Sequence, residues 1–291
     1  MAVGLAIAFG LLTALANAAM LATQHVASTS HDSPRRGWAL VRYLFGHPLW
    51  LLGWLGAIAS LVFQALALHF GPIALVQPLL VSELVFALVL RRWWLHQRLR
   101  RSAWASAATT AVALATFLVL AAPRGPLGEP SASRWVAPSA VTVILVLIAI
   151  AIAIARSATP SRRAGAYAAA AALLWALEAT FIKAATDILA SRSLASLLTS
   201  WPLYALVVCG VLGLVAEQAA LHVGPLKISQ PIIVIVDPLA SVVLGLVIYR
   251  EQFANSPSAI AIAVVAFAVV AFGVVMLTRT VPATVTEAQR R

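Results

Sequence analysis

Nine apolar stretches, each long enough to cross a lipid bilayer, dominate this chain of 291 residues. A helix of about 20 residues spans the ~30 Å hydrocarbon layer of a membrane. The chain is 62% hydrophobic and 10% charged, which is too apolar for a soluble domain of this length. We therefore expect an all-α polytopic membrane protein with spans near 2–27, 48–70, 72–90, 102–122, 135–155, 164–189, 201–222, 225–249 and 257–277.

The basic residues predict how these spans are oriented. With an external N-terminus, fifteen of the 20 Lys and Arg residues fall on the cytoplasmic side, four fall in external loops, and Lys183 lies within a span. Cytoplasmic loops of membrane proteins carry an excess of Lys and Arg, so we expect an external N-terminus and a cytoplasmic C-terminus in the plasma (inner) membrane. The formal net charge of +11 is then mainly a topology signal, and we expect no nucleic-acid partner.

A ten-residue phrase occurs twice in the chain. HFGPIALVQP at 69–78 returns as HVGPLKISQP at 222–231, with the His, Gly, Pro, Gln and Pro in the same places. With nine spans, the first copy lies in an external hairpin and the second in a cytoplasmic one. The sequence thus predicts two inverted-topology repeats, an architecture typical of secondary transporters. The expected divisions are 1–122 for the first repeat (helices 1–4), 123–163 for a linker with an extra fifth helix, 164–278 for the inverted second repeat (helices 6–9) and 279–291 for a cytoplasmic tail.

Within the phrase, the residue types point first to structure. Gly permits a tight reversal, and the Pro that follows it can begin a helix without losing a backbone bond. The second Pro of each copy removes a helical hydrogen bond and can bend the helix. Gln77 and Gln230 stand beside these bends, where an amide could satisfy freed carbonyls or touch a ligand. His69 and His222 are expected to cap helices at the membrane interface, with a proton relay as the less favoured alternative.

Three carboxylates are expected near the middle of their spans: Glu83, Glu178 and Asp237. Charged groups at this depth are costly and are therefore the first candidates for a functional site. Glu83 aligns with the residue before Asp237, so the two repeats place an acid at nearly equivalent positions. We expect these acids, with the two glutamines, to bind a substrate, an ion or protons. They are also tentative metal ligands, because Mg²⁺ keeps several waters and needs only one or two carboxylates.

Weaker candidates surround this set. Glu217 lies nearer the cytoplasmic end of its span, and Lys183 is the only base expected within a span. Lys183 and Asp187 are four residues apart on one helix face and could simply form a pair. Asn17 is favoured as a helix-packing contact. For each acid, the structural alternative is a protonated carboxyl that is hydrogen-bonded to a neighbouring helix.

Three motifs carry a family resemblance: the two AL..GP....QP hairpins, ALLWALEATFIKA in the sixth span and YREQF after the eighth. With them the chain resembles the drug/metabolite transporter superfamily. The nine-span count is most similar to NIPA-type magnesium transporters and their bacterial relatives. The resemblance implies a bundle of two inverted halves that moves a small solute. The chain departs from the superfamily after the third span, where RRWWLHQRLRR stands in place of an acidic residue such as Glu251, and it lacks the NIPA polar pattern around Asp237.

We therefore expect a secondary transporter that works by alternating access, with Mg²⁺ or another divalent cation as one candidate solute. A proton-coupled exporter of a small organic metabolite or drug is the first alternative, with Trp54 and Trp175 lining the solute path. A non-transporting membrane scaffold is the second. An enzyme is not expected, because neither H-E-x-x-H nor G-x-S-x-G occurs, and we expect no cofactor. The expected partners are membrane lipids and the solute, and the sequence leaves homo-oligomers open.

Overall fold

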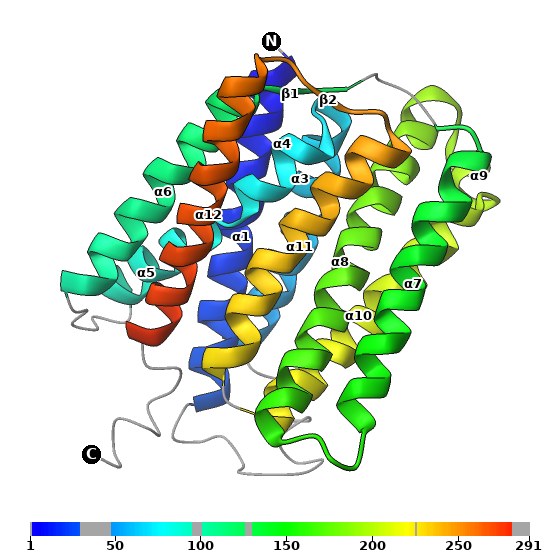
Figure 1. The fold of residues 1–291 in the computed structure, drawn as a ribbon. Helices are drawn as coiled ribbons and strands as arrows, with labels where there is room; N and C mark the ends of the chain where they lie inside the picture. The colour runs from blue at the N-terminus through cyan, green and yellow to red at the C-terminus, as the bar shows by residue number, and fades with distance from the viewer. Residues whose placement is uncertain (1, 30–47, 95–100, 126–129, 225, 281–291) are drawn as a thin grey trace.

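The computed structural model describes residues 2–29, 48–94, 101–125, 130–224 and 226–280, which form a bundle of long helices (Figure 1). This part of the chain contains nine segments that are helical, long and apolar enough to cross a membrane. The expectation of a multi-pass α-helical membrane protein is thereby confirmed. Of the expected polar tail, residues 281–291 lie outside the described part, as do the arginines of 30–47 and 95–100.

The bounds of the elements agree with the expected spans to within a few residues at most ends. The helices are α1 (Ala2–Thr29), α3 (Pro48–Phe70), α4 (Ile73–Leu80), α5 (Glu83–Trp93), α6 (Arg101–Ala121), α7 (Ser133–Ile154), α8 (Pro160–Ser191), α9 (Leu194–Leu198), α10 (Trp201–Val223), α11 (Leu226–Ile248) and α12 (Pro257–Thr280). Two short strands, β1 (Pro123–Arg124) and β2 (Gln252–Phe253), complete the described structure.

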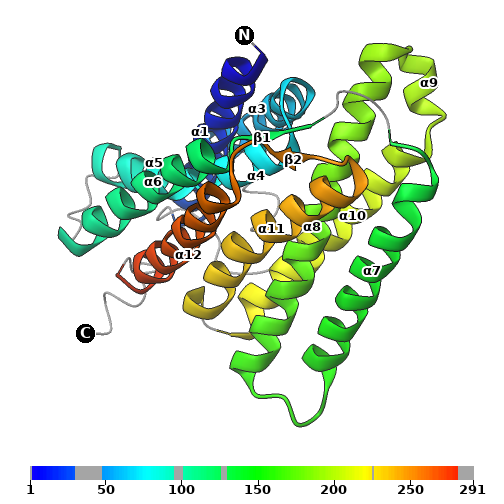
Figure 2. The same cartoon turned by 45° about the horizontal axis from the view of Figure 1, so that its top comes forward.

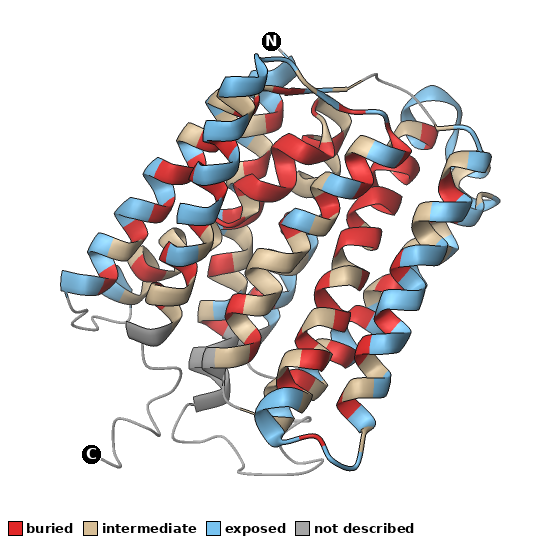
Figure 3. Ribbon diagram, in the orientation of Figure 1, coloured by how far each residue is buried: buried red, intermediate tan, exposed pale blue. Residues whose placement is uncertain are grey.

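Large apolar side chains are exposed along the outside of the bundle, as on α7, where Leu147 is 61% exposed. In lipid, a helix satisfies its own backbone polar groups, and apolar side chains can face the hydrocarbon. Buried residues instead gather on α4 and α8 (Figure 3). The run of alanines at 168–172 lets neighbouring helices approach α8 closely, and α3, α7, α10 and α11 all pack against it.

The third expected span is not one helix. It is divided into α4 and α5 by a turn at Val81 and Ser82. Pro78 lies inside α4 and has no backbone N–H to donate. At the turn, the amide of Val81 donates to the carbonyl of Pro78 at 3.2 Å, and that of Ser82 donates to the carbonyl of Leu79 at 3.1 Å. The expected bend at Pro78 is thus a break in the α-helical hydrogen bonding, three to four residues further along the chain, where the backbones of Val81 and Ser82 stay in the right-handed helical region.

The strand pair was not expected from the sequence. β1 and β2 are antiparallel, with Pro123 opposite Phe253, and they lie across the end of the bundle that also holds the N-terminus (Figure 2). The residues that lead out of α6 and α11 have left-handed backbones, with φ of 40° at Ala122 and 53° at Arg250. These conformations stop each helix and redirect the chain into the pair. We call this end of the bundle the strand end.

The two copies of the repeated phrase lie at opposite ends of the bundle. The turn between α3 and α4 is at the strand end, and the turn between α10 and α11 is at the other end (Figure 1). Each turn has a glycine pressed against an alanine. A Cβ at Gly71 would lie 2.6 Å from the Cβ of Ala6, and a Cβ at Gly224 would lie 2.6 Å from that of Ala164. Any larger residue would require these helices to separate.

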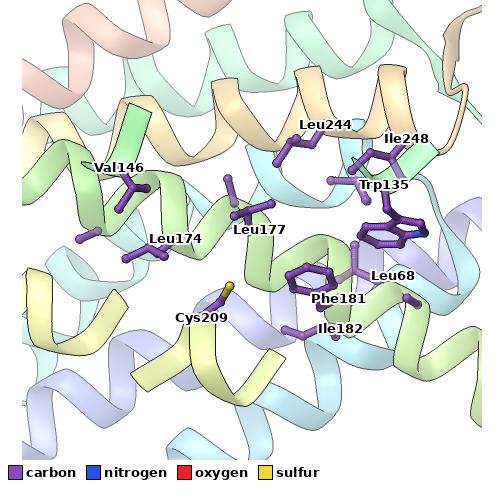
Figure 4. Close-up of a cluster of buried hydrophobic side chains, with 14 of the residues drawn as sticks. Leu68, Trp135, Val146, Leu174, Leu177, Phe181, Ile182, Cys209, Leu244 and Ile248 are labelled. Atoms are coloured by element: carbon purple, nitrogen blue, oxygen red, sulfur yellow. The ribbon is translucent and has the colours of Figure 1, made fainter. Parts of the chain in front are cut away.

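The main apolar core surrounds α8 and holds α7 in place (Figure 4). Trp135 of α7 stacks on Phe181 of α8 with ring centroids 5.1 Å apart, and Trp201 of α10 meets both rings edge-on. Aromatic pairs of this kind stabilise a contact beyond the area they bury. Helix α7, the expected extra fifth helix, therefore packs against α8 and α11 and meets α10 at Trp201.

Candidate solute-binding cluster

Four carboxylates from four helices lie close enough for their charges to interact. Asp237 of α11 interacts with Glu83 of α5, with Glu178 of α8 and with Glu217 of α10, and Glu83 also interacts with Glu217. We call these residues the four-carboxylate cluster. The sequence singled out all four, but it assigned Glu217 only a secondary place.

Glu83 stands at the break in the third span, as the first residue of α5. The side-chain amide of Asn17 on α1 donates to its Oε2 at 3.2 Å, and the hydroxyl of Ser60 on α3 donates to Oδ1 of Asn17 at 2.6 Å. Because Oδ1 accepts from Ser60, the Nδ2 group of Asn17 is left to donate to Glu83. Asn17 thus orients the carboxylate as well as packing between helices.

Ser60 was missed by the sequence reasoning. It is buried within the apolar helix α3, and an isolated serine in such a helix is usually a packing residue. Only the contact with Asn17 gives it a place in the site.

The other three acids have local contacts of their own. The hydroxyl of Ser241, one helical turn further along α11, donates to Oδ1 of Asp237 at 3.1 Å. Glu178 packs on Gly210 of α10, where an added Cβ would lie 3.1 Å from its Oε1. Glu217 is hydrogen-bonded by the side chain of Trp175, which the sequence had placed along the solute path.

The cluster is not a preformed three-ligand metal centre. Within the part of the chain that the structure describes, no three His, Cys, Asp or Glu side chains are grouped so that they could hold one metal ion. The tentative metal site made of Glu83, Glu178 and Asp237 stays a prediction. The three acids come from different helices and have different neighbours. Glu83 accepts from Asn17, Asp237 accepts from Ser241, and Glu178 packs on Gly210. A hydrated ion held by one or two of them needs no such grouping.

The glutamines and histidines of the repeated phrase occupy unequal positions. Gln77 is 2% exposed and its Nε2 has no hydrogen-bond partner, whereas Gln230 is partly exposed. Nδ1 of His69 lies 4.0 Å from Oδ1 of Asp187, whereas His222 is exposed. Neither histidine belongs to the four-carboxylate cluster. A buried amide without a partner costs free energy, which makes Gln77 the stronger of the two candidate glutamines.

Lys183 lies at the strand end, with its side chain 2% exposed. Its Nζ donates to the carbonyl of Leu68 at 2.6 Å and to that of Gly71 at 3.2 Å. These carbonyls are at the C-terminal end of α3, where a helix favours a cation. The charge of Asp187 does interact with Lys183, but the expected simple pair along one helix face is not the main contact of the lysine.

Glu251 lies in the motif YREQF, but the sequence did not predict it as a site residue. It is 3% exposed. The amides of Ile73 and Ala74, at the start of α4, donate to its Oε1 at 2.6 Å and Oε2 at 2.8 Å. Burial raises the pKa of the Glu251 carboxyl, while these two amides and the charge of Lys183 act in the opposite direction. The carboxylate caps α4, whose N-cap residue Pro72 offers no side-chain hydrogen bond.

Comparison with known proteins finds one similar protein, but its activity is not known. An uncharacterized protein from Corynebacterium glutamicum is 28% identical to this chain over 253 residues, which cover 86% of each protein. The chain matches no family model and no solved structure. The function is therefore inferred from the site itself.

Proposed function

We propose that this protein is a secondary transporter that moves a small, positively charged solute by alternating access around the four-carboxylate cluster. The observation that carries the proposal is the broken third span. It places Glu83 at the beginning of a half-helix, where its charge interacts with Asp237 on α11. Transporters commonly build their binding sites near the middle of the membrane from such discontinuous helices. A group of carboxylates there favours a cation.

The packing of the two halves supports the proposal of inverted repeats. In the first half α1 packs against α3, α4 and α5, and in the second half α8 packs against α10 and α11. The glycine of each repeated phrase is pressed against an alanine in the first helix of its own half. Two similar halves at opposite orientation are suited to exchange conformations and to open the cluster to each side in turn. This arrangement is the one expected from the resemblance to the drug/metabolite transporter superfamily.

A divalent cation is the first solute to test. Glu83 and Asp237 interact and come from the two proposed repeats, and Mg²⁺ with most of its waters retained needs no more than two carboxylates. We place the strand end outside the cell and the opposite end in the cytoplasm of a bacterial plasma membrane, following the distribution of Lys and Arg.

A proton-coupled exporter of a small organic solute is the second candidate, and one observation favours it. Glu83 and Asp237 each have a hydrogen-bond donor of their own, Asn17 and Ser241 respectively. Acids that are held one by one can each carry a proton instead of converging on one ion. In that case the same residues are needed, but the transported solute differs.

Transport into liposomes tests the proposal. The purified protein is reconstituted around an entrapped magnesium indicator, and flux is measured with and without a pH gradient. We expect Glu83→Gln and Asp237→Asn to lower flux by about tenfold or more, since each removes a charge from a buried site. Asp187→Asn is the matched control, because Asp187 is an acid near the strand end that contacts His69. It should leave flux within about twofold.

The outcomes separate the candidates. Magnesium flux that the two cluster variants abolish supports the cation transporter. Proton flux that appears only with an organic solute, and that the same variants abolish, supports the exporter instead. A folded wild-type protein that moves neither, or cluster variants that behave like Asp187→Asn, would overturn the proposal and favour a membrane scaffold.

A further inference from the structure

Two buried charges at the strand end hold one turn from both sides. Lys183 donates to the last carbonyls of α3, and Glu251 accepts from the first amides of α4. The turn between them is the first copy of the repeated phrase, at Gly71 and Pro72. The cation meets the negative end of one helix dipole and the anion meets the positive end of the next. The charges of Lys183 and Glu251 also interact with each other.

The same residues connect the turn to the second half of the bundle. Lys183 belongs to α8, and Glu251 follows the end of α11. Between them, the hydroxyl of Tyr249 donates to the carbonyl of Thr180 at 2.9 Å, and Nζ of Lys183 lies 5.5 Å from the centre of the Tyr249 ring. Separating α3 and α4 from α8 and α11 at this end would break the contacts that Lys183 and Glu251 make with the turn, whereas the contacts of Tyr249 join α8 to the end of α11 and would remain.

Glycine lets the carboxylate reach the turn. A Cβ at Gly245 would lie 2.5 Å from Oε2 of Glu251 and 3.3 Å from the Cβ of Ile73. A larger residue at position 245 would therefore displace the carboxylate from the helix end. The amide of Glu251 itself donates to the carbonyl of Gly245 at 3.2 Å.

The repeat does not supply the same two charges at the opposite end. The offset of 153 residues between the repeated phrases places Ser30 and Arg98 at the positions that correspond to Lys183 and Glu251. Both lie outside the described residues, but neither has the charge that its counterpart carries. Burial is also unequal: residues 73–79 of α4 are all buried, whereas of the corresponding residues 228–232 of α11 only Ser229 and Pro231 are buried and the others are partly exposed. Among the described residues, the two-charge arrangement is seen at the strand end.

We propose that Lys183 and Glu251 form a charge lock that keeps the strand end closed, and that this lock opens whenever solute reaches the four-carboxylate cluster from that side. The inference rests on the proposed transport function, because a lock of this kind regulates access to the same cluster. With either charge neutralised, the closed arrangement loses charge-assisted hydrogen bonds, and the population shifts towards a conformation that is open at the strand end.

Cysteine accessibility tests the lock without measuring transport. The chain has one cysteine, so Cys209→Ala gives a background without thiols. Leu75→Cys then places a probe on α4, at a site that is 4% exposed. The protein is reconstituted in vesicles, and a membrane-impermeant thiol reagent is added from each side in turn. We expect Lys183→Met and Glu251→Gln each to speed labelling from the strand side about tenfold, the factor by which a charge-assisted hydrogen bond shifts an equilibrium.

A matched control separates opening from general loosening. Tyr249→Phe removes one buried hydrogen bond at the same end but no charge, and it should change the labelling rate by no more than about twofold. Equal labelling in the background and in the lock variants would overturn the lock, as would an equal increase from Tyr249→Phe.

The double variant Lys183→Met/Glu251→Gln covers the case in which a single variant does not fold, because it leaves no unpaired buried charge. It should fold and label at least as fast as the single variants. A folded double variant with the background labelling rate would also overturn the lock. Failure of the lock and failure of transport are distinguishable: faster labelling without any flux would contradict the proposed function alone, and normal flux with unchanged labelling would contradict the lock alone.

Discussion

The two copies of the repeated phrase begin alike and end differently. After the first copy the helix breaks at Val81 and Ser82, and α5 starts anew at Glu83. After the second copy α11 continues unbroken from Leu226 to Ile248, even though Pro231 and Pro238 lie inside it. Residues 73–78 of the first copy are buried and its turn is held by two charges, whereas His222 in the second copy is exposed.

The difference teaches that proline permits a break but does not impose one. Pro78 and Pro231 are equivalent in the phrase, and each removes one backbone donor. What differs is the sequence that follows. Ser82, four residues after the first copy, corresponds to Ile235, four residues after the second. The Ser82 hydroxyl is buried and makes no hydrogen bond, so the turn gains nothing from it, whereas Ile235 packs against an apolar cluster along a continuous helix.

The largest effect is expected at the two glycines, where the copies are most alike. A side chain at either position meets an alanine Cβ at 2.6 Å. We expect Gly71→Val and Gly224→Val each to lower the free energy of unfolding by about 3 kcal/mol, as overpacking does in a tight core. Thermal unfolding in detergent micelles measures this. A large loss at only one of the two positions would show that the turns are not structurally equivalent.

The next effect tests the broken helix. Ser82→Ile gives the helix after the first copy the isoleucine that stands at the corresponding position, 235, after the second copy. We expect this change to favour a continuous helix that displaces Glu83 from Asn17. Flux in liposomes should fall by about tenfold or more, since small displacements in a binding site are costly. The reciprocal control, Ile235→Ser, should leave flux within about threefold. Equal losses from both would mean that the break is not what the transport step requires.

A smaller effect, of opposite sign, is expected at Gln77. Gln77→Met keeps the volume and removes a buried side-chain Nε2 group that has no hydrogen-bond partner. We expect the free energy of unfolding to rise by about 1 kcal/mol, while flux falls if the amide serves the solute. Gln230→Met, at a partly exposed position, should change stability by less than about 0.5 kcal/mol. A destabilised Gln77→Met protein would count against an unpaired amide.

The smallest effect is expected at the histidines. His69→Ala removes the contact with Asp187 and should cost about 1 kcal/mol of unfolding free energy at most, as exposed ion pairs do. His222→Ala, at an exposed position, should cost less than about 0.5 kcal/mol. Flux should persist in both variants. Loss of flux in either variant would favour the alternative in which the repeated histidines relay protons.

Much of the fold and part of the site could be read from residue types. Long apolar runs predicted the nine spans, and the rule that buried charges are costly selected Glu83, Glu178 and Asp237. Glu251 and Ser60 could not be found in this way. Glu251 follows the end of a helix, where an acid usually faces water, and Ser60 is an ordinary serine in an apolar helix. Their contacts are with residues 177 and 43 positions away, respectively, and no local pattern encodes such pairs.

The sequence by itself determined that this protein is helical and suited to a membrane, because apolar length and the cost of unpaired backbone in lipid leave no other choice. It also placed two similar turns at a fixed spacing. Only the tertiary structure decided that one turn is capped by Lys183 and Glu251, that the helix after it breaks at Ser82, and that four acids come into range of one another. These outcomes depend on which helices meet, and long-range packing, not local propensity, sets that.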